Sequence, residues 1–147
     1  MNTIPNNAPP FLPPAMSDAD LVRLFESGAT PGDSFHHADH VRLAFAYLTQ
    51  YPVLEALARF SSALQRLAVA RGKTRLYHET ITCAFIFLIN ERRERSGTSD
   101  WERFARENPD LFVWKDGILS RYYSNSTLES DFARRVFVLP DISDRSV

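Results

Sequence analysis

Three of the four histidines of this 147-residue chain fall within five positions, in the stretch SFHHADHVRLAFAYL. His37 and His40 are three positions apart, so on a helix their imidazoles would lie one turn apart on one face. That face is the apolar one, because Val41 and Ala44 follow at helical spacing. Two such imidazoles can bind one metal ion or take part in acid–base chemistry. His36 is expected to face solvent or the rim of the site.

The fourth histidine, His78, lies in the stretch YHETIT at the head of a second apolar segment. Burying an imidazole without a partner costs free energy. We therefore expect the heads of the two helices to converge and to form one site from His37, His40, His78 and Glu79. Three imidazoles and a carboxylate would suit zinc, iron, manganese or nickel, with Glu79 as a ligand or as a general base.

A structural role also explains these residues. A histidine in the first turn of a helix can cap it or hydrogen-bond a loop carbonyl, and an HxxH pair lacks the glutamate of the HExxH zinc motif. Glu79 can simply complement the helix dipole. Three hypotheses follow: a metal-dependent enzyme acting on a small organic substrate, a metal-free acid–base enzyme that uses the same histidines, and a non-enzymatic helical module that binds a ligand or partner.

Other polar residues are candidates for contacts with a substrate. Arg42 could hold a substrate carboxylate through two hydrogen bonds, or it is a charge on the helix surface. It joins His78 and Glu79 as a candidate catalytic residue. Tyrosine hydroxyls can donate to a developing anion, although aromatic packing is an alternative role. The candidate substrate-binding residues are Tyr77, Thr82, Arg121, Tyr122 and Tyr123. Asp141 could fix a histidine tautomer or cap a chain end.

Hydrophobic periodicity predicts helices along the whole chain, bounded by capping residues, glycines and prolines. The expected helices run from Ser17 to Gly28, from 33 or 34 to about 50, from Pro52 to Gly72, over 76–95, over 99–107, in one or two pieces over 111–125 hinged at Gly117, and over 126–139. The helix over 76–95 is apolar on nearly every side, so it should be the central and most buried one.

The predicted fold is all-α, a single-domain helical bundle of five to seven helices. The helical domain spans 17–142. Residues 1–16 contain five prolines and are expected to form a flexible arm, and residues 143–147 a flexible tail.

Composition narrows the function classes. The net charge is −1 and no long basic run occurs, which disfavours a nucleic-acid or membrane partner. The chain has one cysteine, Cys83, in an apolar run where a thiol is usually a small buried hydrophobe. No secretory signal, membrane span or glycine-rich phosphate loop appears, so we expect a cytoplasmic protein without a nucleotide or flavin. Whether it forms a homo-oligomer is open.

Several blocks together resemble a family of small, largely uncharacterised bacterial proteins. These blocks are FHHADHVRLAFAYL, YHETIT, NPDLF, RYYS and LESDFARRVFVLPD, and they cover most of the chain from Phe35 to Asp141. The resemblance implies a shared site rather than a particular reaction. The motif residues that it carries over are Phe35, His37, His40, Arg42, Tyr77, His78, Glu79, Thr80 and Thr82. His36 falls at an unspecified position of the motif.

Overall fold

The computed structural model describes residues 16–28, 35–114 and 116–142. Within these ranges all regular secondary structure is helical, with seven α-helices and three short 3₁₀ helices. The prediction of an all-α single-domain fold is therefore confirmed. The predicted N-terminal arm, apart from Met16, and the predicted C-terminal tail lie outside the described residues.

The first three helices begin and end close to the predicted positions. Helix α1 spans Asp18–Glu26, and the Ser17 hydroxyl caps it by accepting a hydrogen bond from the Asp20 amide at 3.1 Å. Helix α2 spans His37–Gln50, so it begins later than the predicted 33 or 34. Helix α3 spans Val53–Ala70 and follows Pro52, as predicted. Gly72 then takes a left-handed conformation with φ of 64°, which turns the chain back toward the core.

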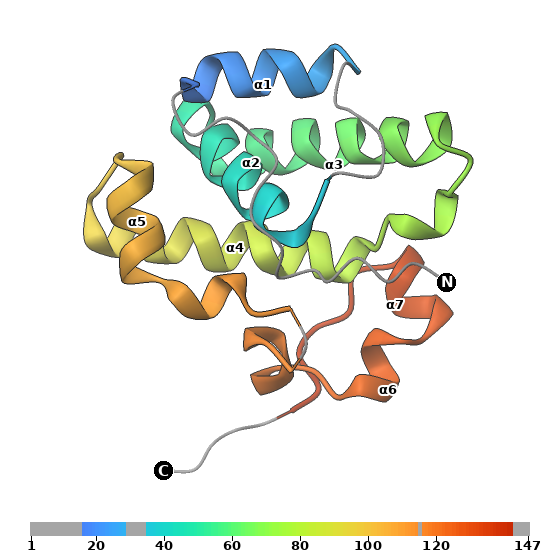
Figure 1. Ribbon diagram of the computed structural model, residues 1–147. Coiled ribbons are helices and arrows are strands. Elements are labelled where there is room, and N and C mark those ends of the chain that lie inside the picture. The colour runs from blue at the N-terminus through green and yellow to red at the C-terminus, as the bar shows by residue number, and fades with distance from the viewer. Residues whose placement is uncertain (1–15, 29–34, 115, 143–147) are drawn as a thin grey trace, which may run out of the picture.

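Helix α4 spans Glu79–Ser96 and is preceded by a 3₁₀ turn, η2, over Thr74–Leu76. The prediction that α4 is the most buried helix was wrong. Eleven of the fourteen residues of α2 are buried, whereas the apolar Phe87 of α4 is 42% exposed. The reason is topological: α2 packs against α1, α3 and α4 together, as Figure 1 shows, and it is enclosed on more sides than α4.

The C-terminal third is built from short helices. Helix α5 spans Trp101–Glu107, and the 3₁₀ helices η3 and η4 span Pro109–Phe112 and Ile118–Arg121. The single helix predicted over 126–139 was wrong: the chain forms α6 over Asn125–Leu128 and α7 over Asp131–Arg135. The Ser130 hydroxyl caps α7 by accepting from the Ala133 amide, which ends one helix and starts the next.

These elements surround the histidine-bearing segments. Helices α3 and α4 pack against each other in opposite directions, and the start of α2 lies between the C-terminal half of α3 and the N-terminal half of α4 (Figure 1). Helix α7 packs against α4 near the start of α4. Among the described residues, no helix has the length and apolar character required to span a bilayer.

Candidate functional site

All four histidines line one cavity, which we call the histidine cavity. Its volume is about 460 Å³, and its walls come from α2, α3, η2, α4, α7 and the chain around Trp114. The predicted convergence of the two histidine-bearing helix heads is therefore seen in the structure. Most of the wall is apolar, supplied by Phe35, Val41, Ala44, Phe60, Leu64, Leu67, Ala68, Leu76, Ile81, Phe85, Ile89 and Trp114.

His37 is buried and fixed in one orientation. Its Nε2 lies 2.8 Å from the carbonyl oxygen of Leu111, and since a carbonyl only accepts, Nε2 carries the proton. The ring packs against Phe85 and Trp114, with centroids 5.0 and 4.9 Å away. Burial lowers the pKa of His37, opposed in part by the Leu111 carbonyl. The imidazole is therefore neutral, and its Nδ1 lone pair accepts no hydrogen bond from the described residues.

His40 is the most strongly perturbed imidazole. Its ring packs on Phe35 with centroids 4.5 Å apart. Burial first, and then the nearby His37 and Arg71, lower its pKa to about 3. No hydrogen bond to either ring nitrogen comes from the described part of the chain. His40 therefore offers the cavity a neutral imidazole with both a donor and an acceptor.

His78 caps helix α4, and both of its ring nitrogens are hydrogen-bonded. Its Nδ1 accepts from the Ile81 amide at 3.1 Å, and its Nε2 donates to the Leu128 carbonyl at 2.7 Å. Burial is the main cause of its lowered pKa, and the positive charge of Arg134 acts in the same direction. His78 thus joins α4 to the segment before α7, and it could not bind a ligand or metal without breaking one of these bonds.

Glu79 and Tyr77 form a pair beside the cavity. The Tyr77 hydroxyl donates to the Glu79 carboxylate at 2.6 Å. Tyr77 lines both the histidine cavity and a neighbouring, more open pocket, whereas Glu79 lines only the second. Thr82, a candidate substrate-binding residue, also lines the histidine cavity. Cys83 is buried, and burial raises the pKa of its thiol to about 11, in agreement with a structural role.

His36 was expected to face solvent or the rim of the site, and the structure places it at the cavity wall and not in solvent. Its backbone amide donates to Asp39 at 2.9 Å at the start of α2. Its ring is largely buried at the cavity wall, and neither ring nitrogen has a hydrogen-bond partner within the described ranges. Residue 36 precedes the first helical turn in an extended conformation, so a helical wheel does not predict its direction.

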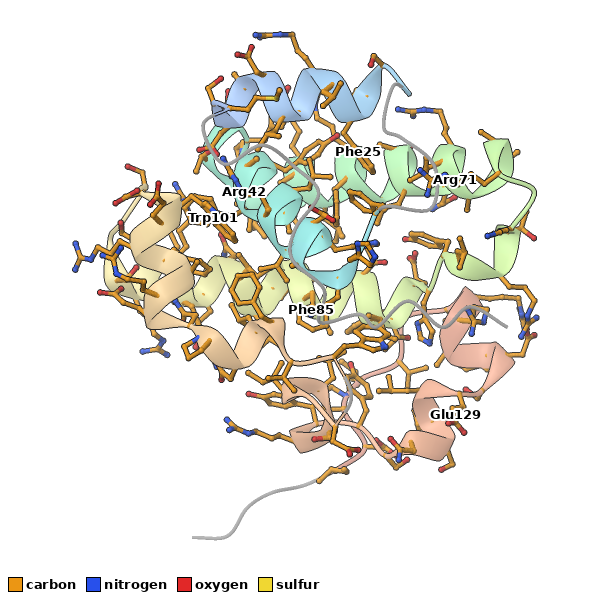
Figure 2. All side chains as sticks on the ribbon, viewed as in Figure 1. Phe25, Arg42, Arg71, Phe85, Trp101 and Glu129 are labelled. Carbon is orange, nitrogen blue, oxygen red and sulfur yellow. The ribbon has the colours of Figure 1, made fainter. Side chains whose placement is uncertain are left out.

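Arg42 does not line the histidine cavity. Its guanidinium donates to the Asp18 carboxylate at 2.6 Å and to the Met16 carbonyl at 3.3 Å. It also lies 5.0 Å from the centre of the Trp101 ring, a contact visible in Figure 2. Asp18 accepts a further bond from Thr49. The structure thus places Arg42 in the contact between α1 and α2.

The candidates near the C-terminus also lie away from the cavity. Arg121 and Tyr122 are exposed at the end of η4. Tyr123 is buried, and its hydroxyl donates to the Val138 carbonyl at 2.7 Å. Asp141 accepts hydrogen bonds from Ser124 and Thr127, which hold the final segment against α6 and lower the pKa of Asp141. Thr80 has a similar structural role, since its hydroxyl meets the carbonyls of Ala133 and Val136.

The sequence did not indicate that Trp114 and four cationic residues line the cavity. The Trp114 ring packs on His37, and Gly117 lies so close to the Val113 carbonyl that a Cβ there would collide with it. The cations on the wall are Arg71, Lys73, Arg75 and Arg134. The stretch RGKTR directly after α3 could have indicated that Arg71, Lys73 and Arg75 gather near the cavity. No local pattern could have indicated Arg134, because α7 is remote in sequence.

Comparisons of the chain with protein-family models, curated proteins and solved structures gave no match. Within the described part of the chain, no group of three or more histidine, cysteine, aspartate or glutamate side chains is arranged to hold a metal ion.

Proposed function

We propose that this protein binds a small organic molecule in the histidine cavity, where His37 and His40 offer it hydrogen bonds. The cavity volume of about 460 Å³ lies within the ~300–1,000 Å³ range typical of small-molecule sites. Its walls combine a largely apolar surface with a few polar groups, which is the usual composition of such sites.

The main support is the state of the His40 side chain. The half-buried His40 imidazole makes no hydrogen bond with a described residue, so the hydrogen bond that it makes with water in the unfolded chain is left for a ligand. A ligand hydroxyl, amide or carboxyl group in the cavity would restore that hydrogen bond. The Nδ1 of His37 supplies a second acceptor one helical turn earlier, so a ligand can be held at two points.

Acid–base catalysis is a second candidate, because two neutral imidazoles lie on one turn of α2. A general base works best when its pKa lies near the working pH. The pKa of His40, about 3, is far below that range, so the substrate itself would have to raise it. We therefore propose ligand binding first, and catalysis would require a bound substrate that raises the pKa of His40.

Metal binding by His37, His40, His78 and Glu79 has weaker support. His37 and His40 have the spacing for two ligands, but both nitrogens of His78 are hydrogen-bonded. Glu79 pairs with Tyr77 and does not line the cavity. His78 and Glu79 would have to give up these hydrogen bonds before they could serve as the third and fourth ligands of a metal ion.

The proposal can be tested by saturation-transfer NMR with four probes: octanoate, 1-octanol, 4-phenylbutyrate and 4-phenyl-1-butanol. Ala68 is buried on the cavity wall, so Ala68→Leu should fill the cavity and abolish binding. Ala70→Leu is the matched control on the exposed side of the same helix. We expect at least one probe to bind the wild type and the control but not Ala68→Leu. Absence of binding by all probes, or undiminished binding by Ala68→Leu, would refute the proposal.

A further inference from the structure

The charged residues on the wall of the histidine cavity are all cationic. Four cationic residues line the wall, and no aspartate or glutamate of the described chain does. The cations come from three separate elements: the end of α3, η2 and α7. Figure 2 shows the labelled Arg71 at the C-terminal end of α3, above the start of α4. The charge therefore gathers at one end of the cavity.

Arg134 has no counter-ion among the described residues. Its Nη1 donates to the backbone carbonyls of Arg75 and Tyr77, and its half-buried side chain makes no ion pair with a described carboxylate. The neighbouring Arg135 and Arg75, in contrast, both pair with Asp131. The Arg134 guanidinium is therefore held by two neutral carbonyls and by no described carboxylate.

One edge of the Arg134 guanidinium makes no hydrogen bond with a described residue. Its Nε–H is buried and has no hydrogen-bond partner within the described ranges. Nε and Nη2 form one planar edge of a guanidinium, and two parallel hydrogen bonds from such an edge match the two oxygens of a carboxylate or phosphate. The hydrogen bonds from Nη1 to the carbonyls of Arg75 and Tyr77 fix the plane of the guanidinium.

We infer that the ligand of the histidine cavity is an amphipathic organic anion, whose carboxylate or phosphate group is held by Arg134 and whose apolar body lies along α4. The inference rests on the proposed function and adds the chemical class of the ligand. Phe85 and Ile89 lie two and three helical turns beyond His78, so the apolar wall extends about 10–16 Å from the cationic end.

The electrostatics of the imidazoles agree with this assignment. The pKa values of His40 and His78 are lowered first by burial and then by nearby positive groups, Arg71 and Arg134 among them. Both arginines therefore disfavour the protonated imidazoles through their positive charge. A bound anion would offset this effect and would favour protonation of the same imidazoles, so anion binding is expected to strengthen as the pH falls.

The test compares matched ligands by isothermal titration calorimetry: 4-phenylbutyrate, 4-phenylbutyl phosphate and 4-phenyl-1-butanol. A charge-assisted hydrogen-bond pair should make at least one anion bind about tenfold or more tightly than the alcohol. The preferred anion distinguishes a carboxylate ligand from a phosphate ligand. In Arg134→Gln the preference should disappear while the alcohol binds as before. Arg135→Gln, which removes the neighbouring exposed cation, should retain the preference.

Salt provides a second readout that needs no variant. Raising NaCl from about 50 to about 500 mM should weaken the anion and leave the alcohol unchanged, even if Arg134→Gln does not fold. Equal binding of the alcohol and both anions by the wild type would overturn the inference and leave the proposed function standing. If no ligand binds, the proposed function falls and the inference with it.

Discussion

Acidification should destabilise this protein through His40. The pKa of His40 is about 3 in the folded chain, against 6.5 for an unperturbed imidazole. Below pH 6.5 the unfolded chain takes up a proton that the folded chain refuses, so stability is complete above that pH and is lost as the pH falls toward the folded pKa. With these two pKa values, the free energy of unfolding should fall by about 2 kcal/mol between about pH 7 and pH 5 from His40 alone.

The assay is urea unfolding of the wild type and of His40→Leu at both pH values. Leucine suits the contact of this side chain with Phe35 and does not titrate. The fall in unfolding free energy should be smaller by about 2 kcal/mol in the variant. His37 and His78, whose pKa values are also lowered, contribute to the fall in both proteins and cancel in the comparison.

The same comparison at higher pH serves as the control. Between about pH 8 and pH 7 the two proteins should change almost in parallel, within about 0.2 kcal/mol, because an imidazole is then neutral in both the folded and the unfolded chain. An equal fall in the wild type and His40→Leu between about pH 7 and pH 5 would show that His40 is not buried as a neutral group. The proposal that a neutral His40 imidazole hydrogen-bonds a ligand in the histidine cavity would then lose its main support.

Two further predictions concern residues that the sequence suggested for the site. Arg42→Met should lower the free energy of unfolding by about 3 kcal/mol, because it leaves the Asp18 carboxylate without its partner. The control Arg23→Met breaks an exposed pair and should cost less than about 1 kcal/mol, and denaturant titration measures both. We also expect elemental analysis of untagged protein to find no stoichiometric metal, since His78 has both nitrogens engaged. About one metal ion per chain, lost in both His37→Ala and His78→Ala, would restore the metal-site hypothesis.

Local signals predicted the helical part of the fold. Ser17 before a helix, Pro52 in a first turn and Gly72 after the last turn act through the backbone of a few neighbouring residues. Such signals depend little on the rest of the chain, so the boundaries of α1 and α3 could be placed from sequence. The final segment was harder, because Ser124 and Ser130 each cap a very short helix where the apolar spacing suggested one longer helix.

Burial was less predictable than periodicity. The apolar composition of α4 suggested a central helix, yet part of its surface, including Phe87, is exposed. Helix α2 contains buried His37, Asp39 and Arg42 and is nevertheless the more enclosed helix. A polar residue is buried where a partner compensates for it. The partners of His37 and Arg42 come from other segments, whereas Asp39 accepts from the nearby His36 amide.

The sequence by itself determined that His37 and His40 lie on the inward face of one helix, because their spacing and the apolar residues that follow act within a single element. The tertiary structure alone decided what surrounds them. His37 donates to the carbonyl of Leu111, 74 positions away in the chain, and His78 to the carbonyl of Leu128, 50 positions away. Arg134 reaches the cavity because α7 packs on α4. Contacts between such distant residues depend on how the helices pack, and no local pattern encodes them.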